Sequence, residues 1–495
     1  MQLYALMTDH VLSIGVNTGN SLDAADVVLT KFGADGSIED LDALSEPMPA
    51  KLAEALRMIR NTVMECDADM KKAGHVYQQR SGHLDSNLQS MDKLITNYTL
   101  YVAEAVKKLI KHWQQKNKSK IAIDLIGFHG QTCAHQPPSI DAEISYTVQI
   151  GNGQLLANET GIPVVFDFRS DDLFNGGEAA PLAPIHHEHL ALNLRNKDKF
   201  PIAFCNAGNT GNISIISLRP DGNIITLGWD VGPFNNYPDK LMQVVQHKSC
   251  DLNGKTGASG KVNMDLLRLF FDKGAVTGSG DNFLLQPPPK SSDPQRYKLI
   301  SQLTSASTNN FSFEDKVRTA EYCAAYFYFY SLKWIPADVS MPVCFALCGG
   351  GWNNPIIRNH FEQLINGNFD DAPILPEHKE LFKEICKRLN QGKKVEVALS
   401  DQYGFSSRYM EARLFAEAAV CRIKGIPFTR PETTGCHSPT VLGIIRHPVQ
   451  GAANEKVKEW LQKYKSATLT LDNPKIFDGR WSRAAAGRST HYKQK

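Results

Sequence analysis

Strand-like and helix-like patterns of apolar residues alternate along the chain. Near its start, Val11–Val16 and Asp26–Phe32 are apolar-rich runs of strand length with a polar turn between them. Met91–His112 instead carries apolar residues at the spacing of a helix, and Ile121–Phe128 returns to a strand pattern. Strands that alternate with helices predict an α/β fold with packed parallel or mixed sheets.

The alternation continues into the second half. Further strands are predicted at Tyr146–Ile150, Pro163–Phe168 and Val343–Cys348, and further helices at Gln154–Thr160, Ala183–Leu192, Phe313–Leu332 and Tyr409–Arg422. Because 495 residues exceed what one hydrophobic core usually supports, we expect two lobes. The predicted division is an N-terminal lobe over 1–195, a C-terminal lobe over 196–450 and a partly flexible extension over 451–495.

A strand–turn–strand unit appears twice, once in each half of the chain. Asn17–Asp23 follows the first strand, and Asn206–Asn212 lies between Ile202–Phe204 and Ile213–Leu218. Tight turns rich in Gly, Asn, Ser and Thr present backbone N–H groups and short hydroxyls, which suit a phosphate chain. One such turn is an ordinary hairpin. Two at the heads of two lobes predict a pair of phosphate clamps facing each other across a cleft.

Charge and composition narrow the classes of partner. The formal net charge is +2 with 21% charged residues, so no large basic field favours nucleic acid. The sequence lacks an apolar run of roughly 18 residues and a signal-peptide pattern, so no membrane association is expected. The 10 cysteines are scattered without a zinc spacing, which predicts reduced thiols in a cytoplasmic protein.

Two carboxylates are candidates for chemistry. Asp230 stands in Trp229–Asn235, which we interpret as a turn stiffened by Gly-Pro and flanked by aromatic residues. A partly desolvated carboxylate of this kind can act as a general base, and the alternative is an aspartate that caps the turn. Glu411 opens a predicted helix, where it is either an exposed helix residue or, through a water, part of a magnesium shell.

Three further segments carry candidate groups. Asp167–Asp172 ends a predicted strand, where ligand-handling residues gather in α/β folds, and the alternative is a salt-bridged loop. Gly349–Gly351 follows a buried strand, so its backbone can approach a flat ring or ribose closely. His186–His189 lacks the usual metal-ligand spacing and is predicted to be a polar helix surface.

Taken in order, these motifs match those of one kinase family. The matching segments are Gly19–Ala24, His129–Thr132, Gln149–Gly151, Asp167–Arg169 with Asp172, Gly176-Gly177 and Ala180–Leu182, Asn206–Ile213, Asp230–Asn235, Cys348–Gly351 with Asn354-Pro355, Met410–Ala412 and Val441–Gly443. The chain thereby resembles the anhydro-N-acetylmuramic acid kinase and levoglucosan kinase family of the actin-like sugar kinase superfamily. The resemblance covers about residues 10–447 without a missing block.

The resemblance implies a fold, a reaction and a set of roles. The fold would be the two-lobed actin-like (ribonuclease H-like) ATPase fold with an interlobe cleft. The reaction would open a 1,6-anhydro sugar by hydrolysis and phosphorylate O6 from ATP, with Asp230 as general base and Mg²⁺ near Asp23 and Glu411. The sugar side would include His129, Gln131, Asp167, Arg169 and Asp172. ATP would contact Gly19, Asn20, Ser21, Asp23, Gly208, Asn209, Thr210, Gly211, Gly349, Gly350 and Gly351. A homodimer is implied as well.

The chain also departs from the family pattern. Ala24 and Asn209 stand where the family has glycine, and Phe234 replaces a glycine beside Asp230. We expect the Phe234 ring to narrow the sugar site, which favours a substrate smaller than a lactyl-bearing sugar. The family's Lys-Ser-Thr-Gly-Arg-Glu loop becomes Lys290–Gln295. Retained carboxylates with altered glycines favour an altered substrate. The alternatives are an impaired member acting as a sensor or scaffold, and a kinase for a non-anhydro sugar.

Overall fold

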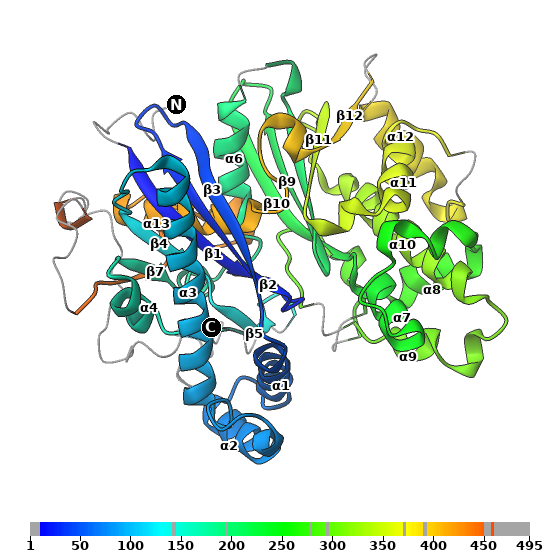
Figure 1. Cartoon of the computed structure of the whole chain (residues 1–495). Helices are drawn as coiled ribbons and strands as arrows, with labels where there is room; N and C mark the ends of the chain where they lie inside the picture. Colours follow the sequence, from blue (N-terminus) through cyan, green and yellow to red (C-terminus); the bar gives the residue numbers. More distant parts are fainter. Residues whose placement is uncertain are drawn as a thin grey trace. The chain divides into compact units, whose positions relative to one another are not determined.

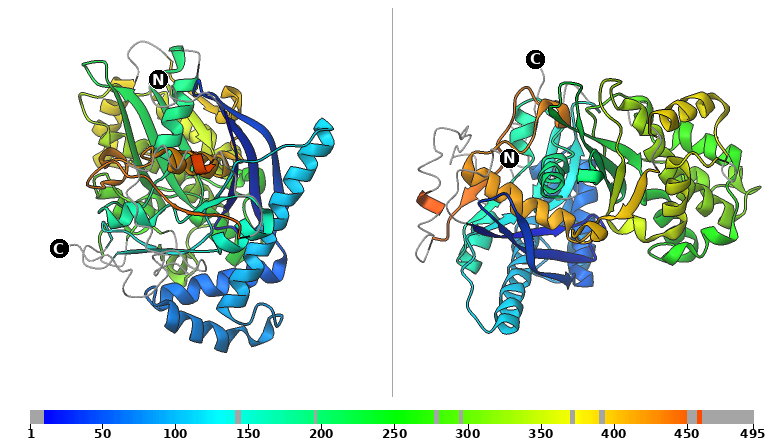
Figure 2. Two further views of the ribbon diagram at one scale, coloured as in Figure 1. Left: turned by 90° about the vertical axis from the view of Figure 1, so that its left-hand side faces the viewer. Right: turned by 90° about the horizontal axis from the view of Figure 1, so that it is seen from above.

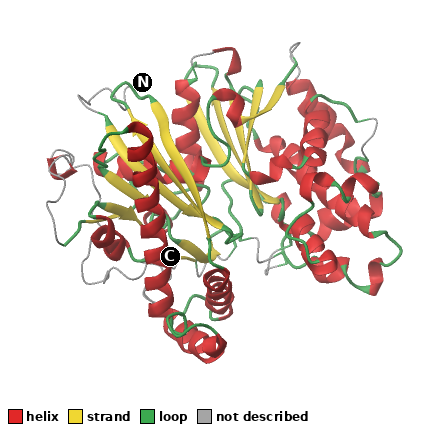
Figure 3. Cartoon of the chain, in the orientation of Figure 1, coloured by secondary structure: helices red, strands yellow, loops and turns green. Residues whose placement is uncertain are grey.

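The chain forms two units. The computed structural model describes residues 10–140, 145–194, 197–276, 280–293, 297–369, 373–389, 394–449 and 457–459. Unit 1 consists of the described parts of Met1–Asn193 and Tyr409–Lys495, and unit 2 of those of Leu194–Arg408. Each unit contains one large sheet bordered by helices (Figure 3). Among the described residues, no helix has the length and apolar character that crossing a membrane requires.

Unit 1 is built around a six-stranded sheet in the order β13-β7-β4-β1-β2-β3 (Figure 1). Its strands β1, β2 and β3 form an antiparallel meander, and β4 and β7 continue the sheet parallel to β1. The strands of unit 1 are β1 (Val11–Thr18), β2 (Ala24–Phe32), β3 (Ile38–Pro47), β4 (Leu125–Phe128), β5 (Gln131–Gln136), β6 (Tyr146–Ile150), β7 (Val164–Phe166) and β13 (Ile444–Arg446). Its helices are α1 (Ala50–Glu65), α2 (Met70–Arg80), α3 (Met91–Asn117), α4 (Gly153–Thr160), α5 (Ser170–Phe174), α6 (Ala183–Asn193), α13 (Met410–Lys424) and α14 (Pro431–Thr434).

Helices cover both faces of this sheet. Successive side chains of a strand point to opposite faces, and both faces carry apolar or small residues. Ile14 and Val16 of β1 belong to one apolar core, which also contains residues of α1 and α3. On the opposite face, glycines let α13 approach: a Cβ on Gly15 would lie 1.8 Å from the Ala412 carbonyl oxygen. Ser13 Oγ donates to the Ala416 carbonyl at 3.0 Å on the same face. The views of Figure 2 show the sheet between α3 and α13.

Unit 2 repeats this arrangement with a five-stranded sheet in the order β10-β9-β8-β11-β12. Again an antiparallel meander, β8 to β10, is extended by two strands parallel to the first of the three. The strands are β8 (Ile202–Ala207), β9 (Thr210–Leu218), β10 (Ile224–Pro233), β11 (Cys344–Cys348) and β12 (Glu396–Leu399). The helices are α7 (Asn236–Gln246), α8 (Met264–Lys273), α9 (Ile300–Leu303), α10 (Phe313–Ser331), α11 (Pro355–Ile365) and α12 (Lys379–Leu389).

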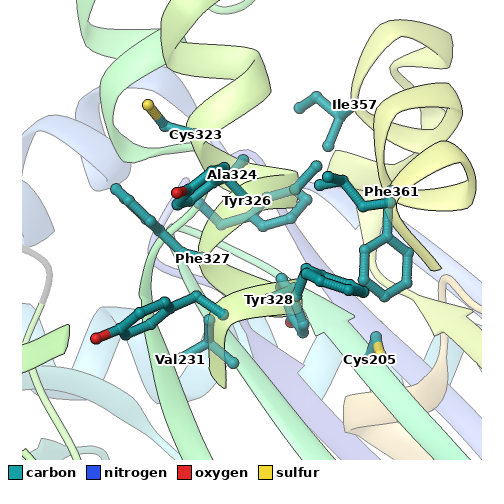
Figure 4. Packing of buried hydrophobic residues seen from close by; sticks show 14 of the residues in the cluster. Cys205, Val231, Cys323, Ala324, Tyr326, Phe327, Tyr328, Ile357 and Phe361 are labelled. Carbon is teal, nitrogen blue, oxygen red and sulfur yellow. The ribbon is translucent and has the colours of Figure 1, made fainter. Parts of the chain in front are cut away.

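The aromatic helix α10 organises the core of unit 2. Figure 4 shows its residues Tyr326, Phe327 and Tyr328 packed near Phe361 of α11 and Val231 of β10. Tyr328 is fully buried, and its hydroxyl donates to the Asn212 carbonyl of β9 at 2.9 Å. The same hydroxyl contacts the Asn206 carbonyl of β8, so one side chain holds the two strands at the head of their hairpin.

The segment after Tyr409 corrects the predicted division of the chain. The sequence assigned residues 196–450 to the C-terminal lobe, but Tyr409 and the described residues after it belong to unit 1. The reason is the packing of α13 against β1 and β4, which Gly15 and Gly127 make possible. Of the predicted extension 451–495, only 457–459 are described, so its flexibility lies outside the described residues.

The predicted polar surface at His186–His189 is wrong, because helix α6 is buried there. His186 is 0% and His189 is 3% exposed. Both rings donate from Nδ1 to the carboxylate of Glu417 on α13, His189 at 2.6 Å. Burial raises the pKa of Glu417, but the two histidines outweigh it and hold that pKa below its ordinary value. A carboxylate distant in sequence therefore supplies the hydrogen-bond acceptor that allows these histidines to be buried.

Removing this carboxylate is expected to destabilise unit 1. Glu417→Ala leaves two buried imidazole N–H groups without their acceptor, so the free energy of unfolding should fall by about 3–5 kcal/mol. Urea denaturation measures the change. Glu104→Ala, which removes an exposed partner of Lys107 on α3, is the control and should change little. Equal stability of the two variants would show that the histidines need no acceptor.

Candidate active site

The candidate residues of unit 1 gather at one end of its sheet. Parallel strands β1, β4 and β7 are in register through Val16, Phe128 and Phe166. The residues that follow each strand's apolar run therefore lie side by side, which brings Asn17, His129 and Asp167 together. The carboxyl ends of parallel strands are where α/β folds bind ligands.

The first hairpin turn, Gly19–Asp23, joins β1 to β2 at this end. The Leu22 N–H donates to the Gly19 carbonyl at 3.2 Å, and Leu22 takes the left-handed conformation with φ 57°. Ser21 Oγ donates to Asp23 Oδ1. Ala24 begins β2 and is not among the described residues with positive φ, so the loss of the family's glycine there costs no backbone strain.

Two exposed carboxylates of unit 1 suit a magnesium ion. Glu411 lies in the first turn of α13 and accepts a hydrogen bond from Asn17 Nδ2 at 2.6 Å. Asp23 is exposed at the end of the first hairpin turn. Among the described residues, no three or more His, Cys, Asp and Glu side chains form a metal cluster. Mg²⁺ is commonly bound by one or two carboxylates, with waters and substrate phosphates as its other ligands, so this donor set fits it.

His129 positions Arg169. His129 Nδ1 is 3.0 Å from the Gly130 carbonyl, which can only accept, and Arg169 Nε donates to His129 Nε2 at 2.9 Å. The ring is therefore neutral with its proton on Nδ1. Burial, together with the Arg169 charge, lowers the pKa of His129 well below its ordinary value. His129 consequently stays neutral near neutral pH, and half-buried Arg169 is the group it presents.

Gln131, Asp167 and Asp172 are buried in the support of this end. Gln131 Oε1 accepts from Thr18 Oγ1 at 3.0 Å, and Asp167 Oδ1 accepts from Ser170 Oγ at 2.5 Å. Asp172 is 0% exposed and accepts from the Ala179 N–H and Thr434 Oγ1, each at 2.7 Å. The Asp172 contacts shape the loop that carries the Ala179 carbonyl, to which Arg169 Nη1 donates at 2.6 Å.

Gln149 belongs to the matched segment Gln149–Gly151, but no role in the site was assigned to it from the sequence. It lies on β6 beside a hollow whose lining includes His129 and Asp167. Its Nε2 donates to Thr147 Oγ1 at 2.8 Å, whereas its buried Oε1 has no hydrogen-bond partner in the described structure. An orphaned buried acceptor beside a hollow suits a ligand hydroxyl or a water. The motif at Gln149–Gly151 was the available signal.

In unit 2, Asp230 lies on strand β10 and not in the predicted turn. The pairing of β10 with β9 shifts between Asp230 and Gly232, so a bulge re-aims this residue. The side chain is 6% exposed. Its Oδ2 accepts from Ser291 Oγ at 3.0 Å and from the Ser292 N–H at 2.9 Å. Pro294 and Gln295 of the same loop lie outside the described residues.

The second hairpin turn and Asp230 lie at the same end of the unit 2 sheet. Asp230 pairs with Asn212, and Pro233 pairs with Thr210 at the start of β9. Thr210 Oγ1 and Asn212 Oδ1 are buried without a hydrogen-bond partner among the described residues. Asn209 is absent from the described residues with positive φ, so it needs no glycine either. Its carbonyl accepts the Phe234 N–H at 2.9 Å.

Gly349–Gly351 reaches this end from strand β11. Gly349 has φ 87°, and a Cβ there would lie 2.7 Å from the Ala207 carbonyl oxygen, so both conformation and contact require glycine. A Cβ on Gly351 would lie 2.6 Å from the Phe234 ring. The three predicted elements of unit 2 (the second hairpin turn, Asp230 and this glycine loop) are therefore neighbours.

Phe234 does not narrow the site, contrary to the expectation from the sequence. The side chain is 1% exposed and belongs to the apolar core of unit 2. Its ring meets Tyr328 and Trp352 edge-on, with centroids 5.5 and 4.8 Å away. The bulge at Asp230 and the N–H bond to Asn209 direct this position inward, so its ring fills volume that a glycine would leave empty.

The two sheets define the class of protein. The order of a three-stranded antiparallel meander followed by two strands parallel to the first occurs in both units, with a candidate phosphate turn between the first two strands each time. This duplication is the actin-like ATPase and sugar kinase fold, as predicted.

Within that class, the chain belongs to the anhydro-N-acetylmuramic acid kinase family, whose sequence model matches residues 11–370 and 379–448. Anhydro-N-acetylmuramic acid kinase of Brucella canis is 28% identical over 442 residues, which cover 89% of this chain and 100% of the relative. The Haemophilus influenzae protein of the same name is 29% identical, with 87% and 97% covered. That of Agrobacterium fabrum is 27% identical, with 88% and 98% covered.

Solved structures are more distant. The chain is similar to a ROK family glucokinase from Streptomyces griseus in complex with glucose and AMPPNP, at TM-score 0.29 and 11% identity, with 83% of this chain and 99% of that one covered. An activator of 2-hydroxyisocaproyl-CoA dehydratase from Clostridium difficile with bound ADPNP gives TM-score 0.34 and 10% identity, with 83% and 94% covered. The assignment of the fold depends on the strand order and not on these scores.

Proposed function

We propose that this protein is an ATP-dependent kinase that opens a 1,6-anhydro sugar with water and phosphorylates it at O6. The observation that carries the proposal is the position of the Asp230 carboxylate. Its buried carboxylate is held by Ser291 and Ser292, next to the second hairpin turn, in a chain of the anhydro-N-acetylmuramic acid kinase family. A carboxylate held beside a phosphate-binding turn can remove a proton close to a transferring phosphoryl group.

The proposed chemistry couples two bond changes. Asp230 takes a proton from a water as the water oxygen attacks C1 of the sugar, and the bond from C1 to O6 breaks. O6 keeps the electrons of that bond and attacks the γ-phosphorus of ATP. The bond from this phosphorus to the β–γ bridging oxygen breaks, and ADP leaves with its electrons. Because phosphoryl transfer depends on positioning and charge neutralisation, the remaining groups have only to hold the reactants.

Each unit carries its own groups for the proposed reaction. In unit 2, the turn Gly208–Gly211 offers backbone N–H groups to phosphates, and Gly349–Gly351 gives the nucleoside close access to backbone. In unit 1, Gly19–Ser21 offers a second phosphate turn. Asp23 and Glu411 would hold Mg²⁺, which supplies charge neutralisation for the phosphates.

The sugar would meet Arg169 and Gln149. Arg169 is half-buried and Gln149 has an orphaned acceptor, whereas His129, Gln131, Asp167 and Asp172 are buried, and His129 contacts Arg169 directly. We propose either anhydro-N-acetylmuramic acid or a levoglucosan-type sugar as substrate. Because the Phe234 ring lies in the core and does not narrow the sugar site, it gives no reason to prefer the smaller sugar. The 10 cysteines are all free thiols, which supports a cytoplasmic location.

The test is turnover in oxygen-labelled water. The protein is incubated with ATP, Mg²⁺ and a panel of anhydro and free sugars, and ADP release and the phosphorylated product are followed. We expect ADP release with an anhydro sugar and labelled oxygen at C1. Turnover of only free sugars without label at C1 would identify a plain sugar kinase. Normal ATP binding without turnover of any sugar would favour a sensor or scaffold. Light scattering would test whether the protein forms the homodimer that the family resemblance implies.

A further inference from the structure

A buried pair of carboxyl groups lies at the turn 251–257 in unit 2, one from the turn itself and one from α10. Glu321 of α10 is 0% exposed, and Asp251 is 6% exposed. A Cβ on Gly257 would lie 1.9 Å from Glu321 Oε2, so this oxygen packs directly against the turn. The N–H of the same glycine donates to Asp251 Oδ2 at 2.8 Å. Gly257 is thus in contact with both carboxyl groups.

The hydrogen bonds show which of the two carries the proton. Asp251 accepts backbone N–H groups at both oxygens, from Thr256 at 2.9 Å and from Gly257, as an ionised carboxylate does. Glu321 Oε1 accepts from Asn354 Nδ2 at 2.6 Å, but its buried Oε2 receives no donor from the described residues. An oxygen buried without a donor beside a carboxylate is best satisfied as an O–H group, so the proton is on Glu321.

The charges around Glu321 agree with this assignment. Burial, helped by the Asp251 carboxylate, raises the pKa of Glu321 to about 8, against the opposing effects of the Asn354 hydrogen bond and Arg318. Asp251 from the turn, Asn354 from α11 and Arg318 from α10 itself are the polar groups that act on it. Glu321 is consequently neutral below about pH 8 and becomes a buried anion above it.

Glu321 is joined to the glycine loop through Asn354. Asn354 caps α11 by accepting the Ile356 N–H at 2.9 Å, and it directly follows the turn Gly350–Asn353. The same Asn354 oxygen would lie 2.7 Å from a Cβ on Gly254, so the acidic turn also packs against the cap. The position of Asn354, and with it the end of the glycine loop, therefore depends on the acid pair.

We propose that protonated Glu321 is a positioning residue for the nucleotide. It bridges Asp251 and Asn354 and so holds Gly349–Gly351 in the conformation that receives the nucleoside. This role rests on the proposed function of the glycine loop. When Glu321 ionises, two like charges face each other in the interior and the bridge to Asp251 is lost. The loop then loses its support while the reacting groups around Asp230 remain in place.

Two measurements on the full chain test the proposal between pH 6.5 and 9. The first is the affinity for a non-hydrolysable ATP analogue, and the second is the unfolding midpoint. If only the protein with neutral Glu321 binds, the apparent affinity at pH 9 should be about tenfold weaker than at pH 7. The unfolding midpoint should also fall as pH rises from 6.5 to about 8 and level off above it, because in that range the native protein holds a proton on Glu321 that the unfolded chain has lost.

Three variants separate positioning from simple packing. Glu321→Gln keeps the acceptor for Asn354 and donates to Asp251, so it should bind as the wild type does at pH 7 and lose both pH dependences. Glu321→Ala should bind at least tenfold more weakly at every pH. Glu362→Gln, an exposed position on α11, is the matched control and should retain the wild-type profile.

The outcomes distinguish this proposal from the proposed function. If the analogue affinity and unfolding midpoint of Glu321→Gln fell with pH as those of the wild type do, the assignment of the titrating proton to Glu321 would be overturned. A lost pH dependence of stability without any change in analogue affinity would overturn the link to the loop. Failure of the wild type to bind the analogue at any pH would overturn the nucleotide function itself, and the stability profile would still decide where the proton lies.

Discussion

Replacing Asp230 with Asn is expected to lower turnover by about 10²- to 10⁴-fold while leaving nucleotide affinity unchanged. The amide oxygen can still accept the Ser291 hydroxyl and the Ser292 N–H, so the loop keeps its anchor. What the amide cannot do is take a proton from water. Single-turnover measurement of ADP formation with saturating sugar isolates this step, and titration with a non-hydrolysable ATP analogue reports binding.

The control for Asp230 is an aspartate of the same unit without a role in the site. Asp221 lies in the exposed turn between β9 and β10, where it accepts the Asn223 N–H at 2.9 Å. Asp221→Asn should leave turnover unchanged. If Asp230→Asn retained full turnover, Asp230 would be a structural acceptor for the 290–293 loop, and the base would have to be sought elsewhere.

The sequence predicted the parts of the site that are local. Gly-rich turns after apolar runs identified both hairpin turns, and the motif at Gly349 identified a turn whose φ of 87° does require glycine. The alternation of patterns predicted α3 and α10 close to their observed bounds, because long helices carry many periodic positions. Such features depend on neighbours within a few residues, so the sequence is enough to predict them.

Features set by distant partners were mispredicted. His186–His189 looked like a polar surface because the carboxylate of Glu417, more than two hundred residues later, is invisible to a local pattern. The return of α13 to unit 1 depends on Gly15, whose missing side chain admits another element's backbone. Gln149 was part of a matched motif, but a role for it could be assigned only once β6 was seen to border the hollow near His129. Register and packing decide these cases.

Phe234 provides the second large effect, because the sequence and the structure assign it opposite roles. If the ring fills the core, Phe234→Ala should lower the free energy of unfolding by about 3–5 kcal/mol, since it empties the space between Tyr328 and Trp352. The variant should gain no activity toward bulkier sugars. Urea denaturation and kcat/KM across the sugar panel measure the two consequences in one preparation.

Phe234→Leu is the matched variant, because it keeps most of the buried volume and loses the edge-on ring contacts. Its destabilisation should be smaller than that of Phe234→Ala, and its sugar preference should equal that of the wild type. Unchanged stability together with a new activity toward a lactyl-bearing sugar would return Phe234 to the substrate site. Because Tyr328 also holds the second hairpin turn, a strongly destabilised Phe234→Ala should weaken ATP affinity before it affects sugar selectivity. A loss of ATP affinity that precedes any change in sugar selectivity is expected only if the Phe234 ring packs into the core.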